Sequence, residues 1–319
     1  MRMHRGRFEI AGSLAMLLVA AGAHGVGQRS GATGILADER WTPPAWTELA
    51  AAPRREVNRY ADSAAYEAAR VDTAFEARRW RYPSDSAEVV ALALRPHAAG
   101  RRPAIVYCRG SYIQQGLEAA LLPQLHRFAR AGYFVVAPQY RGSEGGTGRD
   151  EMGGADVEDV LAAVRLAAAR PDVDPNALYL YGESRGGMMV LQAIRDGARV
   201  RAAATVGAFT DLDSLFRSDA RSASMATKIW PDYESRRDEI ALRRSALRWA
   251  DRIRVPLLIL HGASDPQVPP RQSEQLDAAL TRARTPHELR IVPGGSHTLG
   301  EHAAFRDSLV VSWFGTHAP

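Results

Sequence analysis

A serine flanked by glycines is the feature of this sequence with the clearest chemical potential. Residues 182–187 read GESRGG and place Ser184 within the pattern G-x-S-x-G. The apolar segment 177–181 before it predicts a buried strand, and the spacing of the apolar residues in 188–194 predicts a helix after it. Strand, sharp turn and helix are the context in which such a serine projects above a sheet, so Ser184 is the predicted nucleophile. Side chains in place of the glycines would collide with the neighbouring strand or helix.

A serine hydroxyl becomes a strong nucleophile when a histidine accepts its proton and a carboxylate orients that histidine. Asp265 follows the apolar segment 255–260, in HGASDPQVPP, and His297 follows the segment 288–292, in PGGSHTL. Each therefore comes directly after a predicted strand, in the chain order serine, acid, histidine. We predict Ser184 as nucleophile, Asp265 as the orienting acid and His297 as the base.

Other residues could take two of these roles. Asp211 and Asp213 also follow a predicted strand and are alternatives for the acid, and His302 is an alternative for the base. His261 lies four residues before Asp265 and is interpreted as a packed loop histidine. The charged side chains on either side of the serine are expected to be solvated or ion-paired.

An oxyanion formed at the substrate needs two hydrogen-bond donors. One is expected to be the backbone N–H of Arg185, directly after the nucleophile. The other is expected from the loop that follows the apolar strand 104–107, where the backbones of Arg109 and Gly110 are the candidates. Cys108 precedes them without a histidine motif beside it, so we interpret it as a buried structural thiol.

Predicted strands and helices alternate along most of the chain, which predicts an α/β fold with a mostly parallel sheet of about eight strands and helices on both faces. Glycine-rich loops follow several strands, at the sheet edge where such folds bind ligands. Residues 211–252 are polar and helical and predict a small helical insertion. Phe216 and Trp230 within it could line an acyl pocket under a partial lid, or could be ordinary packing.

The first residues combine arginines, a short apolar run over 10–23 and small residues after it, which together predict a signal peptide over 1–25. Residues 26–75 are expected to form a linker and an N-terminal helix, and 76–319 a catalytic domain. We therefore expect an exported protein, periplasmic or secreted. The alternative is a chain tethered to the membrane by an uncleaved signal.

Composition excludes several other classes. The chain has 319 residues and a net charge of +5, but its basic residues are scattered and form no dense run, so nucleic-acid binding is not expected. Its single cysteine excludes an internal disulfide, and its nine histidines show no metal-ligand spacing. We expect no metal, no cofactor and no stable membrane insertion. The oligomeric state is left open.

Several segments together resemble the catalytic domain of the prolyl oligopeptidase family of serine peptidases. They read PAIVYCRGSY, APQYRGSEGGTGRDEMGGADVEDV, LYLYGESRGGMM, VPLLILHGASDPQVP and PGGSHTL, and they extend over roughly residues 77–315. The resemblance implies an α/β-hydrolase fold, with Ser184, Asp265 and His297 as the catalytic triad. Family members usually carry a β-propeller before this domain, and some use a tyrosine hydroxyl in the oxyanion hole. This sequence shows neither feature.

The chemistry expected is therefore hydrolysis of a small peptide or ester substrate through an acyl-enzyme. The loop motifs favour a peptidase acting on peptide or aminoacyl amide bonds. The missing propeller favours the alternative, a carboxylesterase acting on small acyl esters. A third interpretation is a catalytically silent hydrolase fold used for binding, against which the complete set of three residues argues.

Overall fold

The computed structural model describes residues 34–58, 61–97, 99–110, 118–217 and 220–319. They belong to one compact unit that extends from Gly31 to Pro319. The predicted signal peptide over 1–25 lies outside the described residues.

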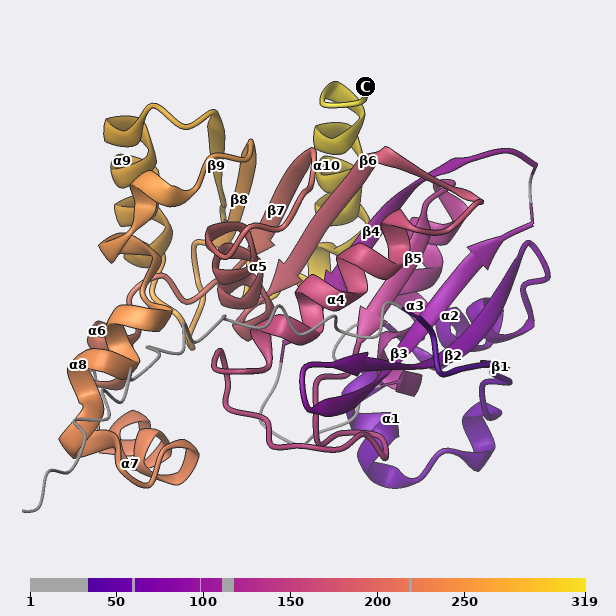
Figure 1. The fold of residues 1–319 in the computed structure, drawn as a ribbon, viewed down its shortest axis with the longest axis horizontal. Coiled ribbons are helices and arrows are strands. Elements are labelled where there is room, and N and C mark those ends of the chain that lie inside the picture. The colour runs from indigo at the N-terminus through magenta and orange to yellow at the C-terminus, as the bar shows by residue number, and fades with distance from the viewer. Residues whose placement is uncertain (1–33, 59–60, 98, 111–117, 218–219) are drawn as a thin grey trace, which may run out of the picture. The chain divides into compact units, whose positions relative to one another are not determined.

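The described residues form a sheet of nine strands in the order β1-β2-β3-β5-β4-β6-β7-β8-β9 (Figure 1). Neighbouring strands are antiparallel from β1 to β5 and parallel from β5 to β9. This confirms the predicted mostly parallel α/β fold, with nine strands in place of about eight. The strands are β1 (Ala37–Arg40), β2 (Phe75–Ser84), β3 (Ala87–Pro96), β4 (Arg102–Cys108), β5 (Phe134–Pro138), β6 (Val173–Glu183), β7 (Ala202–Val206), β8 (Leu257–Gly262) and β9 (His287–Val292).

Helices cover both faces of this sheet, because its central strands are apolar on both sides. In β6, Leu178 and Leu180 contribute to the core on one face, whereas Tyr179 and Tyr181 contribute to the core on the other. The α-helices are α1 (Ala51–Val57), α2 (Ser63–Val71), α3 (Glu118–Arg130), α4 (Val157–Ala168), α5 (Arg185–Arg195), α6 (Leu212–Phe216), α7 (Ala220–Ile229), α8 (Tyr233–Arg244), α9 (Arg271–Ala283) and α10 (Ala303–Thr316).

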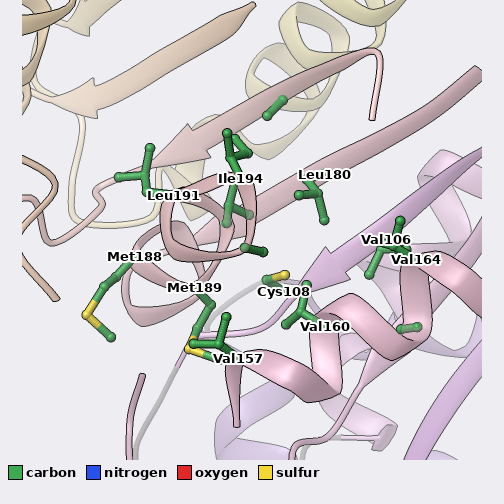
Figure 2. Packing of buried hydrophobic residues seen from close by; sticks show 14 of the residues in the cluster. Val106, Cys108, Val157, Val160, Val164, Leu180, Met188, Met189, Leu191 and Ile194 are labelled. Atoms are coloured by element: carbon green, nitrogen blue, oxygen red, sulfur yellow. The ribbon is translucent and has the colours of Figure 1, made fainter. Parts of the chain in front are cut away.

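Two of these helices fix the position of the predicted nucleophile. Figure 2 shows Met189 of α5 beside Val157 and Val160 of α4, and it shows Met188 and Leu191 on the other side of α5. All five side chains are buried. Fully burying an aliphatic side chain of this size contributes about 1.5–3 kcal/mol, so α5 is held firmly against the sheet directly after β6.

The segment expected to be a linker and one helix is more ordered than its composition suggested. β1 pairs with β2 in the main sheet, and two helices, α1 and α2, stand where one N-terminal helix was expected. Val57 and Tyr66 are fully buried in the core that also contains α3 and α10. The pairing of β1 uses backbone groups and exposed side chains, which is why the apolar pattern gave no signal for it.

The predicted insertion between β7 and β8 contains α6, α7 and α8. Phe216, Trp230 and Tyr233 pack against one another there, with ring centroids 5.7–6.1 Å apart, and all three are buried in the core. The Trp230 indole donates a hydrogen bond to the Glu151 carbonyl, and Arg244 donates to the Met152 carbonyl. Trp230 and Arg244 therefore hold the insertion to the glycine-rich loop 144–154, and the three aromatic residues act as packing residues.

Candidate active site

Ser184 lies at a strained turn between β6 and α5. Its backbone has φ 55° and ψ −122°, a conformation that costs on the order of 1–3 kcal/mol and persists only where the surroundings impose it. The glycines permit this turn. A Cβ at Gly182 would overlap the backbone of Gly186, and a Cβ at Gly186 would overlap the carbonyl group of Cys108 on β4. The turn thus requires glycine at both positions.

A continuous hydrogen-bond chain joins the three residues predicted to form the triad. His297 Nε2 lies 2.8 Å from Ser184 Oγ, and His297 Nδ1 lies 2.7 Å from Asp265 Oδ2. The serine follows β6, the aspartate follows β8 and the histidine follows β9, so the parallel strands bring all three to one sheet edge. Each residue is 8–9% exposed, but the side chain of Asp265 is fully buried, whereas that of His297 is partly accessible.

Four nitrogen atoms surround the carboxylate of Asp265. Its Oδ1 accepts the backbone N–H groups of Gln267 and Val268 at 2.8 and 2.9 Å. Its Oδ2 faces His297 Nδ1 and also His261 Nε2, the latter at 3.1 Å. Burial by itself would raise the pKa of Asp265, but the hydrogen bonds from His261, His297 and Val268 outweigh it and hold that pKa well below its usual range. The group is therefore an anion throughout the physiological pH range.

The loop expected to supply the second oxyanion donor lies against the nucleophile. A Cβ at Gly110 would lie 3.4 Å from Ser184 Cβ and 3.1 Å from the Glu183 carbonyl oxygen, so this backbone approaches the serine as closely as glycine allows. The Arg109 side chain points elsewhere and donates to the Gln139 carbonyl at 2.7 Å. The backbone of 109–110 thus lies beside Ser184, and its role as an oxyanion donor stays a prediction.

The side chain of Arg185 forms a buried ion cluster. Its guanidinium donates to both carboxylate oxygens of Asp150, at 2.8 and 2.5 Å, and to Asp156 at 2.8 Å. It also lies over the ring of Tyr140, 4.5 Å from the centroid. Burial would lower the pKa of Arg185, but the two carboxylates outweigh it and raise that pKa. The ion pair expected beside the serine is therefore fully buried, and it connects the turn at Ser184 to the glycine-rich loop 144–154.

A second buried ion pair lies behind the serine. The Glu183 carboxylate is 3.0 Å from Arg306 Nη1 of α10, and the same nitrogen donates to the Thr298 carbonyl at 2.7 Å. Arg306 thus connects Glu183, the residue before the predicted nucleophile, with Thr298, the residue after the predicted base. Neither Arg306 nor the acidic partners of Arg185 were identified from the sequence, since long-range ion pairs leave no local pattern.

The alternative acids and base are engaged elsewhere. Asp211 accepts from the Ser214 N–H as the N-cap of α6, and Asp213 pairs with Arg237 at 2.7 Å. His302 lies in the short 3₁₀ helix η4 (Gly300–His302). His261 is fully buried as expected of a packed histidine, but its ring also contacts Asp265. Asp265 and His297 are therefore the acid and the histidine that the structure brings to Ser184.

The absence of two further features is stated for the described part of the chain only. No group of three His, Cys, Asp or Glu side chains within it is arranged to hold a metal ion. None of its helices has both the length and the apolar composition needed to cross a bilayer. Cys108 is fully buried, and burial raises the pKa of its thiol well above the usual value.

Comparison with known proteins places these features in a family context. The sequence model of the prolyl oligopeptidase family matches residues 122–318. The uncharacterized peptidase YtmA of Bacillus subtilis is 28% identical over 208 residues, which are 65% of this chain and 80% of that protein.

Solved structures show the same fold. A puromycin-hydrolyzing peptidase of Mycobacterium tuberculosis superposes with a TM-score of 0.65 at 26% identity, over 78% of this chain and 40% of that chain. An acylaminoacyl peptidase of Pyrococcus horikoshii superposes with a TM-score of 0.65 at 19% identity, over 77% and 42% of the two chains. This chain therefore spans about two fifths of the length of these solved relatives.

Proposed function

The chain belongs to the prolyl oligopeptidase family of serine peptidases, and we propose that it hydrolyses peptide or aminoacyl amide bonds through a triad of Ser184, His297 and Asp265. The observation that carries this proposal is the chain of hydrogen bonds from Ser184 Oγ to His297 Nε2 and from His297 Nδ1 to Asp265 Oδ2. The names of related peptidases support the amide substrate.

In the proposed first step, Ser184 Oγ attacks the carbonyl carbon of the substrate while its proton moves to His297 Nε2. The carbonyl oxygen takes the negative charge, and the backbone N–H of Arg185 and one from 109–110 donate hydrogen bonds to it. Such a donor contributes on the order of 3 kcal/mol to the transition state. Asp265 stabilises the imidazolium and remains ionised.

The tetrahedral intermediate then collapses. The carbon–nitrogen bond breaks, His297 gives its proton to the leaving amine, and the acyl group stays on Ser184 as an ester. Water attacks this ester in the second half-reaction, again with His297 accepting the proton, and the acid product leaves. Each proton transfer passes through His297, which hydrogen bonds connect to Ser184 and Asp265.

The test compares one N-blocked aminoacyl group presented as its nitroanilide and as its nitrophenyl ester, with Ser184→Ala as the blank. Hydrolysis of both substrates, abolished in the variant, is the expected result. Because esters are more reactive than amides, cleavage of the ester alone would instead assign a carboxylesterase to the same triad. Silence on both substrates would contradict the triad.

We also propose that the protein is exported, on the basis of the arginines and the short apolar run at its start. Fractionation of producing cells, followed by N-terminal sequencing of the protein, tests this. A periplasmic or secreted protein that begins near residue 26 is expected. A full-length chain in the membrane fraction would instead indicate an uncleaved anchor, and a full-length chain in the cytoplasm would contradict export.

A further inference from the structure

We infer that His261 is a positioning residue for catalysis, which holds Asp265 in the orientation that His297 requires. This inference rests on the proposed triad. It starts from the position of His261 at the end of β8, where the ring is fully buried and its Nε2 lies 3.1 Å from Asp265 Oδ2. Two histidines thus converge on one carboxylate oxygen, and the proposed reaction uses only His297.

The neighbours of His261 determine which of its nitrogens donates. Its Nε2 also lies 2.9 Å from the carbonyl oxygen of Val268, which can only accept a hydrogen bond. Nε2 therefore carries a proton, which it donates to the Val268 carbonyl, and the same N–H lies 3.1 Å from the Asp265 carboxylate. Its Nδ1 lies 2.6 Å from the hydroxyl of Ser273, which is fully buried on α9. The Ser273 contact fixes the ring from the other side.

This arrangement restricts the Asp265 side chain. The backbone N–H groups of Gln267 and Val268 hold Oδ1, so Oδ2 is the atom that remains for the two histidines. Without the N–H of His261, Oδ2 would keep only its contact with His297. The negative charge of the carboxylate would then act on His297 alone, and it would hold a proton on His297 more strongly. His261 therefore adjusts both the orientation and the charge of the carboxylate.

The charged and titratable groups at the ring are few. Asp265 faces it from its own loop, His297 lies beyond that carboxylate on the loop after β9, and α9 presents the neutral hydroxyl of Ser273. The effect of His261 on the reaction is thus expected to pass through Asp265.

The test measures the rate at which a fluorophosphonate labels Ser184, as a function of pH, alongside kcat and KM for the aminoacyl ester. His261→Met and His261→Gln form a matched pair, since both side chains are unbranched and similar in length but only Gln offers an N–H donor near the Nε2 position. Ser273→Ala removes the support on the other side of the ring with little change in volume. Circular dichroism and thermal melting establish that each variant is folded.

His261→Met is expected to lower the labelling rate and kcat about ten- to a hundred-fold, the loss commonly caused by removing a partner one step from a reactive group. KM should change little, and the acid limb of the pH profile should move to higher pH. His261→Gln should recover most of the rate, and Ser273→Ala should show a smaller change in the same direction. If His261→Met does not fold, Ser273→Ala carries the test through the same pH profile.

Equal losses in the Met and Gln variants, or an unchanged pH profile in a folded His261→Met or Ser273→Ala protein, would overturn the inference and leave the triad standing. Failure of the proposed function has a different signature. In that case the unmodified protein is not labelled at Ser184, or Ser184→Ala is labelled equally, and the inference about His261 falls with it.

Discussion

Asp265 shows most clearly, at the scale of single residues, how the surroundings give a side chain its role. Both of its oxygens face donors, two from the backbone and two from histidines, so the carboxylate is both ionised and fixed in direction. Asp211 also follows a strand, but its carboxylate caps α6, whereas the carboxylate hydrogen-bonded to His297 is that of Asp265. The difference lies in the partners of the two carboxylates.

Replacing Asp265 by Asn tests this assignment. The amide would keep the volume but would favour the wrong tautomer of His297, so kcat is expected to fall by about 10⁴-fold, as in other triads of this kind. Asp211→Asn is the matched control, because Asn also caps helices well and stability should be retained. Steady-state kinetics measure both variants. A large loss of kcat in Asp211→Asn, with Asp265→Asn active, would reverse the assignment of the acid.

The pH dependence of activity gives a second prediction at this scale. Because the pKa of Asp265 lies well below its usual range, this carboxylate should stay ionised while activity falls on the acid side. Protonation of the base alone then causes the loss, and log(kcat/KM) should rise with pH with a slope of one. A slope of two in the acid limb, where both groups would titrate, would contradict the ionised state of Asp265.

At the scale of elements, the junction of β6 and α5 is the most constrained part of the molecule. β6 delivers Ser184 in a strained conformation, α5 begins one residue later, and Gly186 at the start of this helix lies against the carbonyl group of Cys108 on β4. Buried ion pairs join this junction to the glycine-rich loop through Arg185 and to α10 through Glu183. The position of the serine therefore depends on several elements.

A methyl group at this junction should be costly. Gly186→Ala would place a Cβ within the backbone of the neighbouring strand, so we expect a loss of about 3 kcal/mol or more in unfolding free energy, together with loss of activity. Gly315→Ala is the matched control, since Gly315 also lies in a helix but has open space around it. It should be neutral or stabilising by up to about 1 kcal/mol. Urea denaturation compares the two, and equal stability would contradict the steric account.

At the scale of the whole molecule, the segment before β2 belongs to the same sheet and core as the catalytic elements. Asp38 on β1 pairs with Arg78 and accepts from the Trp80 indole on β2, while Val57 of α1 and Tyr66 of α2 are buried. The described residues of this segment therefore pack with the segment that the sequence pattern assigned to the catalytic domain, and a domain boundary near residue 76 stays a prediction.

Two versions of the chain test this boundary. A protein that starts at residue 75 would lose the burial of Leu49, Val57 and Tyr66, each worth about 1.5–3 kcal/mol. It should melt at a clearly lower temperature than a protein that starts at residue 31, or be insoluble. Equal melting temperatures in differential scanning calorimetry would show that the N-terminal segment adds nothing to the core.

Sequence patterns predicted the central strands, the helices around them and the family, because these depend on apolar periodicity and on local motifs. They also selected Ser184, Asp265 and His297, which the structure brings within hydrogen-bonding distance and whose catalytic roles stay predictions. β1 was not predicted because its pairing depends on the backbone. The contact of His261 with Asp265 and the ion-pair partners of Arg185 and Glu183 were missed because they depend on the folded arrangement of several loops.

The most direct test of the central claim is rapid-mixing kinetics with the nitrophenyl ester, combined with the mass of the intact protein after quenching. If deacylation is slower than acylation, one equivalent of nitrophenol should appear in a burst, and the protein should gain the mass of the acyl group on the peptide that contains Ser184. Ser184→Ala should show neither. Turnover that persists in Ser184→Ala, or an acyl group on another residue, would contradict the account.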